Sequence, residues 1–600
     1  APCEAMLFVE FFDDCQEKLA ELGKRKVGMR KLICLEAREQ ELVWALRKSG
    51  LTLLTGCKGA AKPTPGLEDV CVRPALLPQY VEGLAKIVEQ NGLEASYYGH
   101  AGAGLLHVRP KLDLHTAKDI ARYRKVMEEV SELCRQFKGS FAGEHGVGIT
   151  RTEFVEDHLG AELMQAMREI KGLFDPKGIL NPGKVIPNGH YRLDEKLRQG
   201  AGHLIELPFL PVLGYVATGE EITSTRGRAN TIRAAMEGRL GGGDPLLSEE
   251  LAAALDNCLS CKACKTECPS NVDLAQLKAD LNYAKHRRRG VPVVDRLIAH
   301  ADLLGRINAG PLAPITNAVL RLRLTRWLTG KVLGFTPERT MPAYTRERFD
   351  RWFARRQSPR RATRGRVILF DDTWVRYNEP NIGKAAVKVL EAAGFEVMLP
   401  RGRKCCGRPA MSRGVLNLVE KLGRHNVDHF NGQGGDEPIV FLEPSCYSMF
   451  VDDYLNFRIS GAEQVSRRCV QFEQFVYELL EREPAAIPFR KDGLKVAIHG
   501  HCHAKALTDV NVLPKLAGRI PGAQVKMLET GCCGMAGAFG MLASKYELSK
   551  AVAGPLVEQI NALPTGTRLV ASGTSCRHQI THLTDAEPLH MAEWLATAID

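Results

Sequence analysis

The chain has 600 residues, of which 44% are hydrophobic and 25% are charged, as in a globular protein of roughly three to five domains. Its net charge of +11 is spread over several short basic runs, and no nucleic-acid recognition motif accompanies them, so we expect no nucleic-acid partner. No window reaches the roughly 18 consecutive apolar residues of a membrane span, so we expect no transmembrane segment. Many cysteines stand in CxxC and CC pairs, and no signal peptide precedes them. This pattern predicts reduced, metal-binding thiols in the cytoplasm.

The opening of the chain reads as the middle of a domain. Residues 3–10 form an apolar run that predicts a buried strand. A helix is expected over 13–23, and a further strand and a helix around 36–49 should follow. The chain does not begin with methionine, and the predicted strand starts almost at once. We therefore expect a preceding part that contains more of the same domain.

A histidine-rich pattern follows. His100 and His107 lie in the glycine-rich strand and turn at 97–107, and a predicted helix at 116–138 leads to Gly143-Glu144-His145-Gly146. Two histidines and a glutamate suit a borderline divalent ion such as zinc. His145 would then be a free base that can take a proton near neutral pH. A lone histidine is more often structural, and the Gly-Glu-His-Gly context is what favours a site.

The strongest iron–sulfur motif is Cys258, Cys261 and Cys264, followed by Cys268 and a proline. This spacing matches the ferredoxin run that holds a [4Fe–4S] cube, and thiolates are the ligands that such iron prefers. A zinc knuckle and a chance cluster are the alternatives. Residues 188–245 before it read as a connector.

Helices are expected from 272 to about 340. Within them, the basic and apolar segment 319–333 either packs on the cluster domain or rests on a membrane surface. A polar, arginine-rich linker is predicted over 345–366.

The last part of the chain contains an internal repeat. Each copy has a strand, a second strand before a Cys-Cys-Gly, and a third strand that ends in Ser-Cys. The second copy carries Cys502, Cys532, Cys533 and Cys576. The first copy is degraded, because Thr373 stands where the second has Cys502, and a purely structural role is its alternative to cofactor binding.

Three motifs carry a family resemblance: the segment at 99–107, Gly-Glu-His-Gly, and Asp-Pro-Lys-Gly-Ile-Leu-Asn-Pro-Gly-Lys at 175–184. They resemble the C-terminal substrate domain of FAD-linked oxidases, which include D-lactate, glycolate and D-2-hydroxyglutarate dehydrogenases. Over nearly its whole length the chain looks like the later part of the large fused FAD and iron–sulfur D-2-hydroxyglutarate dehydrogenases of bacteria.

The resemblance implies that His100, His107 and Glu144 hold the metal and that His145 removes the substrate's hydroxyl proton while a hydride leaves for FAD. The flavin would be held mainly by an upstream domain or subunit, so this chain alone is expected to be inactive. The chain departs from its relatives at Ala103 and Leu105, where many have Asp and Asn. It also lacks the cysteine motif that the fused family usually has between the equivalents of 217 and 218, through a deletion or as a variant with one cluster fewer.

The repeat resembles the CCG domain of heterodisulfide-reductase and glycerol-3-phosphate dehydrogenase electron-transfer subunits. In that family, paired cysteines can ligate an unusual iron–sulfur centre.

We therefore expect a multidomain α+β and α/β protein. Its predicted parts are an FAD-linked oxidase C-terminal domain (1–187), the connector (188–245), a helical ferredoxin-like [4Fe–4S] domain (246–344), the linker (345–366) and tandem α/β CCG domains (367–485 and 486–600).

The expected function is oxidation of a D-2-hydroxy acid, with D-2-hydroxyglutarate ahead of D-lactate and glycolate. Electrons would pass through FAD and iron–sulfur centres to a quinone or redox protein, in the cytoplasm or at the inner face of the membrane. The alternative is a non-catalytic iron–sulfur subunit that docks on a separate flavoprotein.

Overall fold

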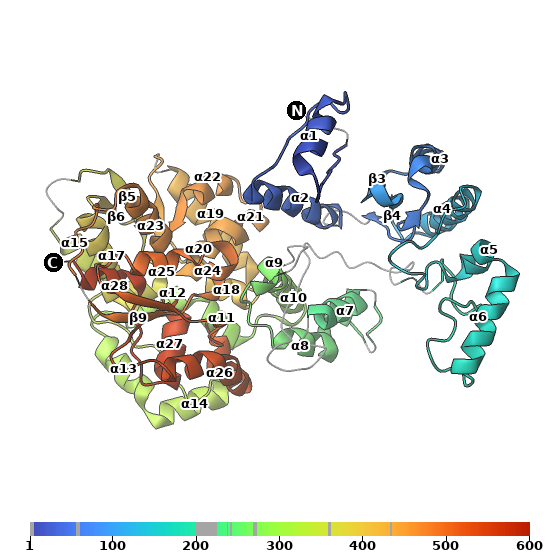
Figure 1. The fold of residues 1–600 in the computed structure, drawn as a ribbon. Coiled ribbons are helices and arrows are strands. Elements are labelled where there is room, and N and C mark those ends of the chain that lie inside the picture. The colour runs from blue at the N-terminus through green and yellow to red at the C-terminus, as the bar shows by residue number, and fades with distance from the viewer. Residues whose placement is uncertain are drawn as a thin grey trace. The chain divides into compact units, whose positions relative to one another are not determined.

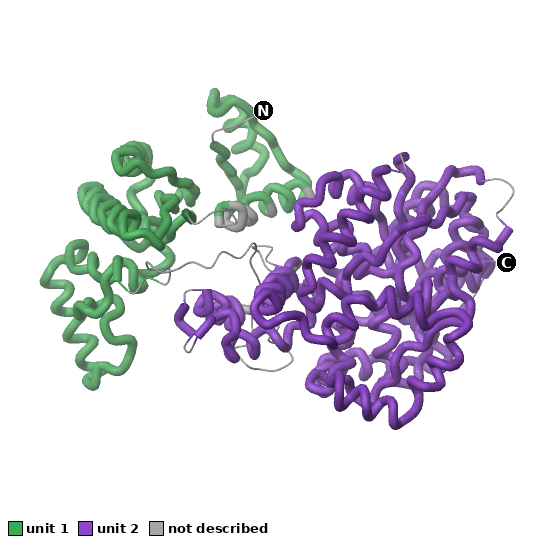
Figure 2. Tube along the Cα trace, turned by 180° about the vertical axis from the view of Figure 1, so that it is seen from behind, with its two compact units in different colours: residues 1–201 green, residues 202–600 purple. Residues whose placement is uncertain are grey.

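The computed structural model describes residues 5–55, 61–195, 197, 225–236, 238–240, 243–267, 273–357, 362–432, 435–491 and 493–599 (Figure 1). The chain divides into two compact units, Ala1–Ala201 and Gly202–Asp600 (Figure 2). Among the described residues, no helix is both long and apolar enough to cross a membrane.

The first unit is built on a small antiparallel sheet in the order β1-β4-β2, with β3 paired to β4. Helices α3 and α4 pack on each other and bury Leu84, Val126 and Val130. The bounds are β1 Lys62–Pro63, β2 Val70–Cys71, α3 Leu77–Gln90, β3 Ala95–His100, β4 Leu105–Leu112, α4 Ala117–Gln136, α5 Val155–Leu159 and α6 Ala161–Phe174.

The β3–β4 hairpin turns at Gly104. Its φ of +70° is a left-handed conformation that glycine adopts without strain. A Cβ at this position would lie 1.8 Å from the carbonyl oxygen of Val72. The pairing sets Tyr98 opposite His107 and His100 opposite Leu105. The hairpin therefore brings the two predicted histidines to one end of the sheet.

The predicted opening strands are wrong. Residues 5–10 are exposed and have no strand structure, and no strand lies between α1 (Cys15–Lys24) and α2 (Ala37–Thr55). A strand needs a neighbour for its backbone hydrogen bonds, and none of β1 to β4 pairs with these segments. The two predicted helices are confirmed.

The described part of the second unit begins with helices, and those from 273 onward lie where helices were predicted. Ile232, Leu251 and Leu277 are buried together. The bounds are α7 Thr225–Met236, α8 Glu249–Asp256, α9 Ala263–Glu267, α10 Leu274–Arg289, α11 Val293–Ala299, α12 Ala301–Asn308, α13 Ala313–Arg321 and α14 Arg323–Leu333.

Helix α7 corrects the predicted connector at 188–245. Its Arg228 is fully buried and donates a 2.6 Å hydrogen bond to the carbonyl of Ala254, so this end of the connector belongs to the helical core. The expected cysteine-motif gap at 217 and 218 lies outside the described residues, as does Cys268.

Two parallel sheets follow, one for each copy of the sequence repeat. The first has the order β6-β5-β7-β8 and the second β10-β9-β11, so each places its first strand between its second and third. The bounds are β5 Arg366–Phe370, β6 Glu396–Met398, β7 Ile439–Phe441, β8 Cys469–Gln471, β9 Lys495–Ile498, β10 Gln524–Met527 and β11 Arg568–Val570.

This order fixes where the cysteines meet. Cysteines follow the carboxyl ends of β6, β7, β9, β10 and β11. In a parallel sheet whose first strand is central, loops on its two sides diverge and leave a crevice at that edge. Each sheet therefore gathers its cysteines at one edge.

Helices flank these strands: α16 Thr373–Tyr377, α17 Pro380–Ala392, α18 Arg408–Ser412, α19 Leu416–Gly432, α20 Pro444–Ser448, α21 Tyr454–Asn456, α22 Ala462–Arg468, α23 Phe472–Arg482, α24 Cys502–Leu507, α25 Val512–Ala517, α26 Tyr546–Asn561, α27 Thr574–Leu583 and α28 Met591–Thr597. The predicted linker at 345–366 contains a helix, α15 (Phe349–Arg355), that the polar composition concealed. Phe349 is fully buried in the core that both sheets share.

A buried histidine caps the last helix and makes stability depend on pH. His590 Nδ1 accepts the backbone N–H of Ala592 at 3.0 Å, and its Nε2 lies 3.0 Å from the carbonyl of Leu442. Burial, aided by the charge of Arg577, lowers the pKa of His590 to about 4. Because the unfolded chain binds this proton near pH 6.5, acid favours unfolding.

We expect His590→Asn, which keeps a capping side chain, to flatten the loss of stability between pH 6.5 and 4. In the native chain this histidine should account for a loss of roughly 3 kcal/mol over that range. Urea unfolding at a series of pH values measures it. The exposed His300→Asn is the control, and equal slopes for His590→Asn and the native chain would contradict the assignment.

Candidate functional site

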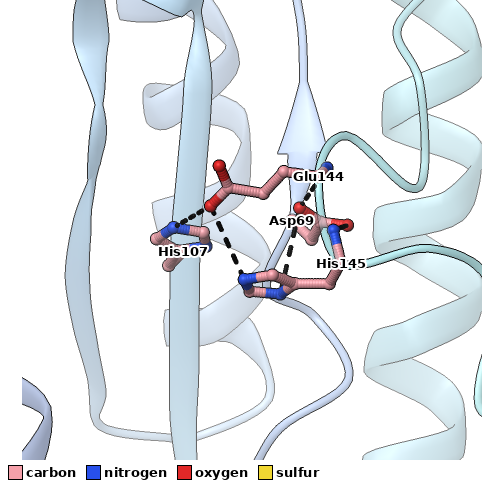
Figure 3. A group of neighbouring side chains, drawn as sticks. All are labelled: Asp69, His107, Glu144 and His145. Carbon is pink, nitrogen blue, oxygen red and sulfur yellow. Dashed lines mark hydrogen bonds and ion pairs between the residues drawn. The ribbon is translucent and has the colours of Figure 1, made fainter.

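The histidine site of the first unit is centred on one carboxylate oxygen. Glu144 Oε1 lies 3.1 Å from His107 Nε2, 3.5 Å from His145 Nε2 and 3.7 Å from His100 Nε2. The rings of His107 and His145 are stacked, with their centroids 5.0 Å apart, and Figure 3 shows both side chains beside Glu144. All four predicted residues therefore meet, with His100 at the margin of the group.

Burial differs among these side chains. His107 is buried, whereas Glu144, His145 and His100 are each about half exposed. Burial, followed by repulsion from His145, lowers the pKa of His107 and keeps its imidazole neutral. A neutral imidazole is the form that binds a metal.

Asp69 is a site residue that the sequence did not reveal. Its fully buried carboxylate accepts the backbone N–H of Glu144 at 2.8 Å and that of His145 at 2.9 Å (Figure 3). It lies 3.9 Å from His145 Nδ1. Since each of its oxygens accepts one backbone N–H, Asp69 orients the Glu-His pair. An acid 75 positions upstream carries no local signal of this contact.

The donor set suits a divalent ion. A tetrahedral ion with bonds of about 2.1 Å holds its ligand atoms roughly 3.4 Å apart, close to the separations around Glu144. The ligand atoms of Asp69, His107, Glu144 and His145 all lie within 4.8 Å of one another. Imidazole and carboxylate together favour zinc or a similar ion.

The second unit holds the cysteine loop, residues 258–264, which runs from the end of α8 into the first turn of α9. Ser260 and Lys262 adopt left-handed φ values of +53° and +61°, which turn the loop tightly. Cys258 and Cys264 are buried, and the backbone N–H of Leu274 donates to Cys264 Sγ at 3.3 Å. The three cysteines thus share one loop, and a backbone donor points at sulfur.

Burial dominates the chemistry of this loop. It raises the pKa of Cys261 to about 12, with a further rise from the nearby thiol of Cys502. It likewise raises the pKa of Cys264 to about 12. Thiols in such a place need bound cationic iron or zinc to become thiolates.

The quartet, Cys502, Cys532, Cys533 and Cys576, meets at the edge of the second sheet. Its side chains form a continuous chain of thiol contacts in that order through Cys532 and Cys533 to Cys576. The backbone N–H of Gly534 donates to Cys532 Sγ at 3.4 Å. The structure therefore brings together all four cysteines predicted for the second copy, and they are free thiols.

The first copy gathers its own group. Cys406 Sγ lies 2.9 Å from Cys446 Sγ, and Thr373 contacts Cys405 in the place of the missing fourth cysteine. Cys405, Cys406 and Cys446 are all buried. Three of the four cysteine positions of the second copy are thus also cysteines in the copy that the sequence marks as degraded.

Comparisons with known proteins agree with this division. Residues 1–185 match the family model of the C-terminal domain of FAD linked oxidases, and residues 369–451 match that of the cysteine-rich CCG domain. The histidine site falls within the first match and the group of Cys405, Cys406 and Cys446 within the second.

Several known proteins are similar to large parts of the chain. It is 27% identical to a D-2-hydroxyglutarate dehydrogenase of Escherichia coli K12 and 25% identical to that of Haemophilus influenzae, in each case over 91% of this chain and 60% of the relative. It is 28% identical to a subunit of the anaerobic glycerol-3-phosphate dehydrogenase of Escherichia coli K12, over 50% of this chain and 76% of that protein. The chain thus spans about 60% of the length of the D-2-hydroxyglutarate dehydrogenases it matches.

Asp69→Asn tests the orienting role of that carboxylate. One of the two N–H groups would face an amide NH₂, which should weaken Zn²⁺ binding about 10- to 100-fold, as loss of an outer partner does. Calorimetric titration with Zn²⁺ measures the affinity. Asp113→Asn is the control, because Asp113 also accepts a backbone N–H, from His115, outside the site. Unchanged affinity in Asp69→Asn would contradict the role.

Cys261→Ser tests the cysteine loop. Anaerobically purified chain should be brown, with about four irons for this site, and the variant should lose that iron and its visible absorption. Cys134→Ser, which alters a buried cysteine of the first unit, is the control. Equal iron in the Cys261 variant and the native chain would rule out the loop as a ligand.

Proposed function

We propose that this chain, which carries an FAD linked oxidase C-terminal domain and a CCG domain, is the substrate-binding and electron-transfer part of a D-2-hydroxy acid dehydrogenase. The favoured substrate is D-2-hydroxyglutarate, with D-lactate and glycolate next. The convergence of three imidazoles on Glu144 Oε1 carries the proposal. The similarity to the D-2-hydroxyglutarate dehydrogenases supports it.

The protein's residues divide the chemistry between them. His100, His107 and Glu144 would hold a divalent ion, zinc in the simplest case, and such an ion would supply Lewis-acid polarisation of the substrate's hydroxyl and carboxylate oxygens. His145 accepts the hydroxyl proton on its ring nitrogen, and Asp69 fixes its backbone. A flavin-binding domain or subunit that partners this chain would hold most of the FAD, which would supply the acceptor for the hydride from carbon.

Electrons then leave through iron–sulfur centres. Cys258, Cys261 and Cys264 would hold a [4Fe–4S] cluster in a helical ferredoxin-like domain, and Cys268 is the fourth cysteine of the same motif. The quartet holds a second centre in the second of two CCG domains. The buried thiols and the backbone N–H groups directed at Cys264 and Cys532 support both assignments.

The acceptor is a quinone or a redox protein. A cavity of about 360 Å³ in the second unit has Met535 and His578 in its lining, each two residues from a quartet cysteine. Arg321 and Arg339 add positive charge to the same cavity. It offers an acceptor a place near the quartet.

Helices α13 and α14 support a place at the inner face of the membrane. Ile315, Leu324, Trp327 and Val332 are more than half exposed. The segment 313–333 has arginines and a lysine but no acidic residue. Exposed apolar side chains among basic ones suit the headgroup region of an anionic bilayer.

Trp327→Glu tests this surface. It should abolish co-sedimentation with vesicles that contain phosphatidylglycerol, because a charge replaces the interfacial ring. Val293→Glu, at an apolar position of α11 that is also exposed, is the control. Equal sedimentation of Trp327→Glu and the native chain would reject the membrane surface and leave a protein partner as its occupant.

A non-catalytic electron-transfer subunit is the second candidate, and the similarity of half the chain to the glycerol-3-phosphate dehydrogenase subunit favours it. Substrate binding distinguishes the two. We expect calorimetry to detect binding of D-2-hydroxyglutarate to the native chain only after Zn²⁺ is added, and His107→Ala to abolish it.

In preparations that also contain the flavin-binding partner, His145→Ala should lower turnover by about 10²- to 10⁴-fold, the usual contribution of a general base. Dye reduction with D-2-hydroxyglutarate measures it. His158→Ala, in the same unit but bonded to Ser131 away from the site, is the control. Metal-independent behaviour, or full turnover in His145→Ala, would favour the subunit without chemistry of its own.

A further inference from the structure

We propose that His503 is a positioning residue that joins the cysteine loop to the quartet, so that an electron crosses between their centres at Cys261 and Cys502. The inference rests on the proposed function, since it requires both centres. It adds a specific contact for the electron path. The transfer moves one electron from the reduced loop centre to the oxidised quartet centre, and His503 keeps its bonds and its oxidation state.

The His503 ring makes two hydrogen bonds, one at each of its nitrogens. His503 Nε2 lies 3.1 Å from the carbonyl oxygen of Ser260, and its Nδ1 lies 3.1 Å from Ser448 Oγ. A carbonyl can only accept, so Nε2 carries the proton and Nδ1 is the acceptor. The ring is buried, and leaving either nitrogen unpaired would be costly.

These partners place three cysteines next to one contact. Ser260 directly precedes Cys261 in the loop, His503 directly follows Cys502 in α24, and Ser448 lies two residues after Cys446. Helix α9, which follows the loop, packs against α24. The thiols of Cys261 and Cys502 are also near enough that the charge of Cys502 adds to burial in raising the pKa of Cys261.

A second set of contacts holds the loop in place. Lys262 is fully buried, and its Nζ lies 2.6 Å from Asp452 Oδ2, 2.9 Å from Asp453 Oδ1 and 3.1 Å from Asp273 Oδ2. Lys265 and Arg408 also pair with these aspartates. The paired charges dock the loop on the segment after Cys446, while His503 sets its position against Cys502.

The first copy shows that this histidine is specific to the docked side. Trp374 stands after Thr373 as His503 stands after Cys502, and it contacts the ring of His578 at 5.9 Å. His578 follows Cys576 by two residues, as Ser448 follows Cys446. The pair Trp374 and His578 therefore makes only a ring contact. The equivalent pair, His503 and Ser448, is hydrogen-bonded, and His503 also reaches the cysteine loop.

The test uses paramagnetic resonance on the whole chain with its iron reconstituted. Dithionite reduces the loop centre and gives it an electron-spin signal. In the native chain, the quartet centre should speed the relaxation of that signal. A Cys532→Ser, Cys533→Ser variant with an empty quartet gives the reference without that neighbour. His503→Leu should lose the enhancement and approach this reference, and His582→Leu, which instead loses a contact to Tyr546, should keep it.

Two further variants separate positioning from simple folding. His503→Gln can still donate to Ser260 and should retain the enhancement, whereas the shorter His503→Asn should lose it. Unchanged relaxation in His503→Leu at full iron content, or equal behaviour of the Gln and Asn variants, would overturn the inference. Iron for only one centre in the native chain would remove the basis of both the proposed function and this inference. Full iron without any enhancement would overturn the inference alone.

Discussion

The cost of burying a charged group without a compensating charge shapes three places in this chain: the cysteine loop, the quartet and the histidine site. The thiols of the cysteine loop and the quartet lie in places where burial and neighbouring thiols raise their pKa values. Thiols in such places stay protonated unless a bound cation stabilises their thiolates. In the histidine site, the Glu144 carboxylate faces three imidazoles, and a bound cation would likewise suit these groups.

Other buried charged side chains of the second unit are paired with side chains of opposite charge. Lys262 is surrounded by Asp273, Asp452 and Asp453, and Arg577 pairs with Glu379 at 2.7 Å. Breaking one partner of a buried pair costs more than the pair contributes, so such contacts fix the position of a loop more than they add stability. Lys262 therefore holds the cysteine loop in place, whereas the cysteines of the loop are the groups proposed to bind a cofactor.

The sequence predicted the local features well. Short motifs identified residues that the structure brings together, because each motif is a short stretch of chain. They are the Gly-Glu-His-Gly motif, the spacing of Cys258, Cys261 and Cys264, and the two Cys-Cys-Gly runs. The opening strand at 3–10 failed, since apolar patterning cannot say whether a pairing edge exists. Helix α15 was hidden in a polar linker because Phe349 is buried by residues distant in sequence. Asp69 and His503 gain their roles from contacts 75 and 243 positions away, which no local pattern encodes.

The proposed function thus joins a metal-assisted oxidation of a hydroxy acid to two proposed iron–sulfur centres in one chain. The most direct measurement adds D-2-hydroxyglutarate, without oxygen or dithionite, to the chain together with its flavin-binding partner and follows the iron–sulfur centres by paramagnetic resonance. We expect the substrate to reduce these centres in the native protein and to leave them oxidised in His145→Ala. Centres that stay oxidised in the native protein, although dithionite reduces them, would contradict this electron path.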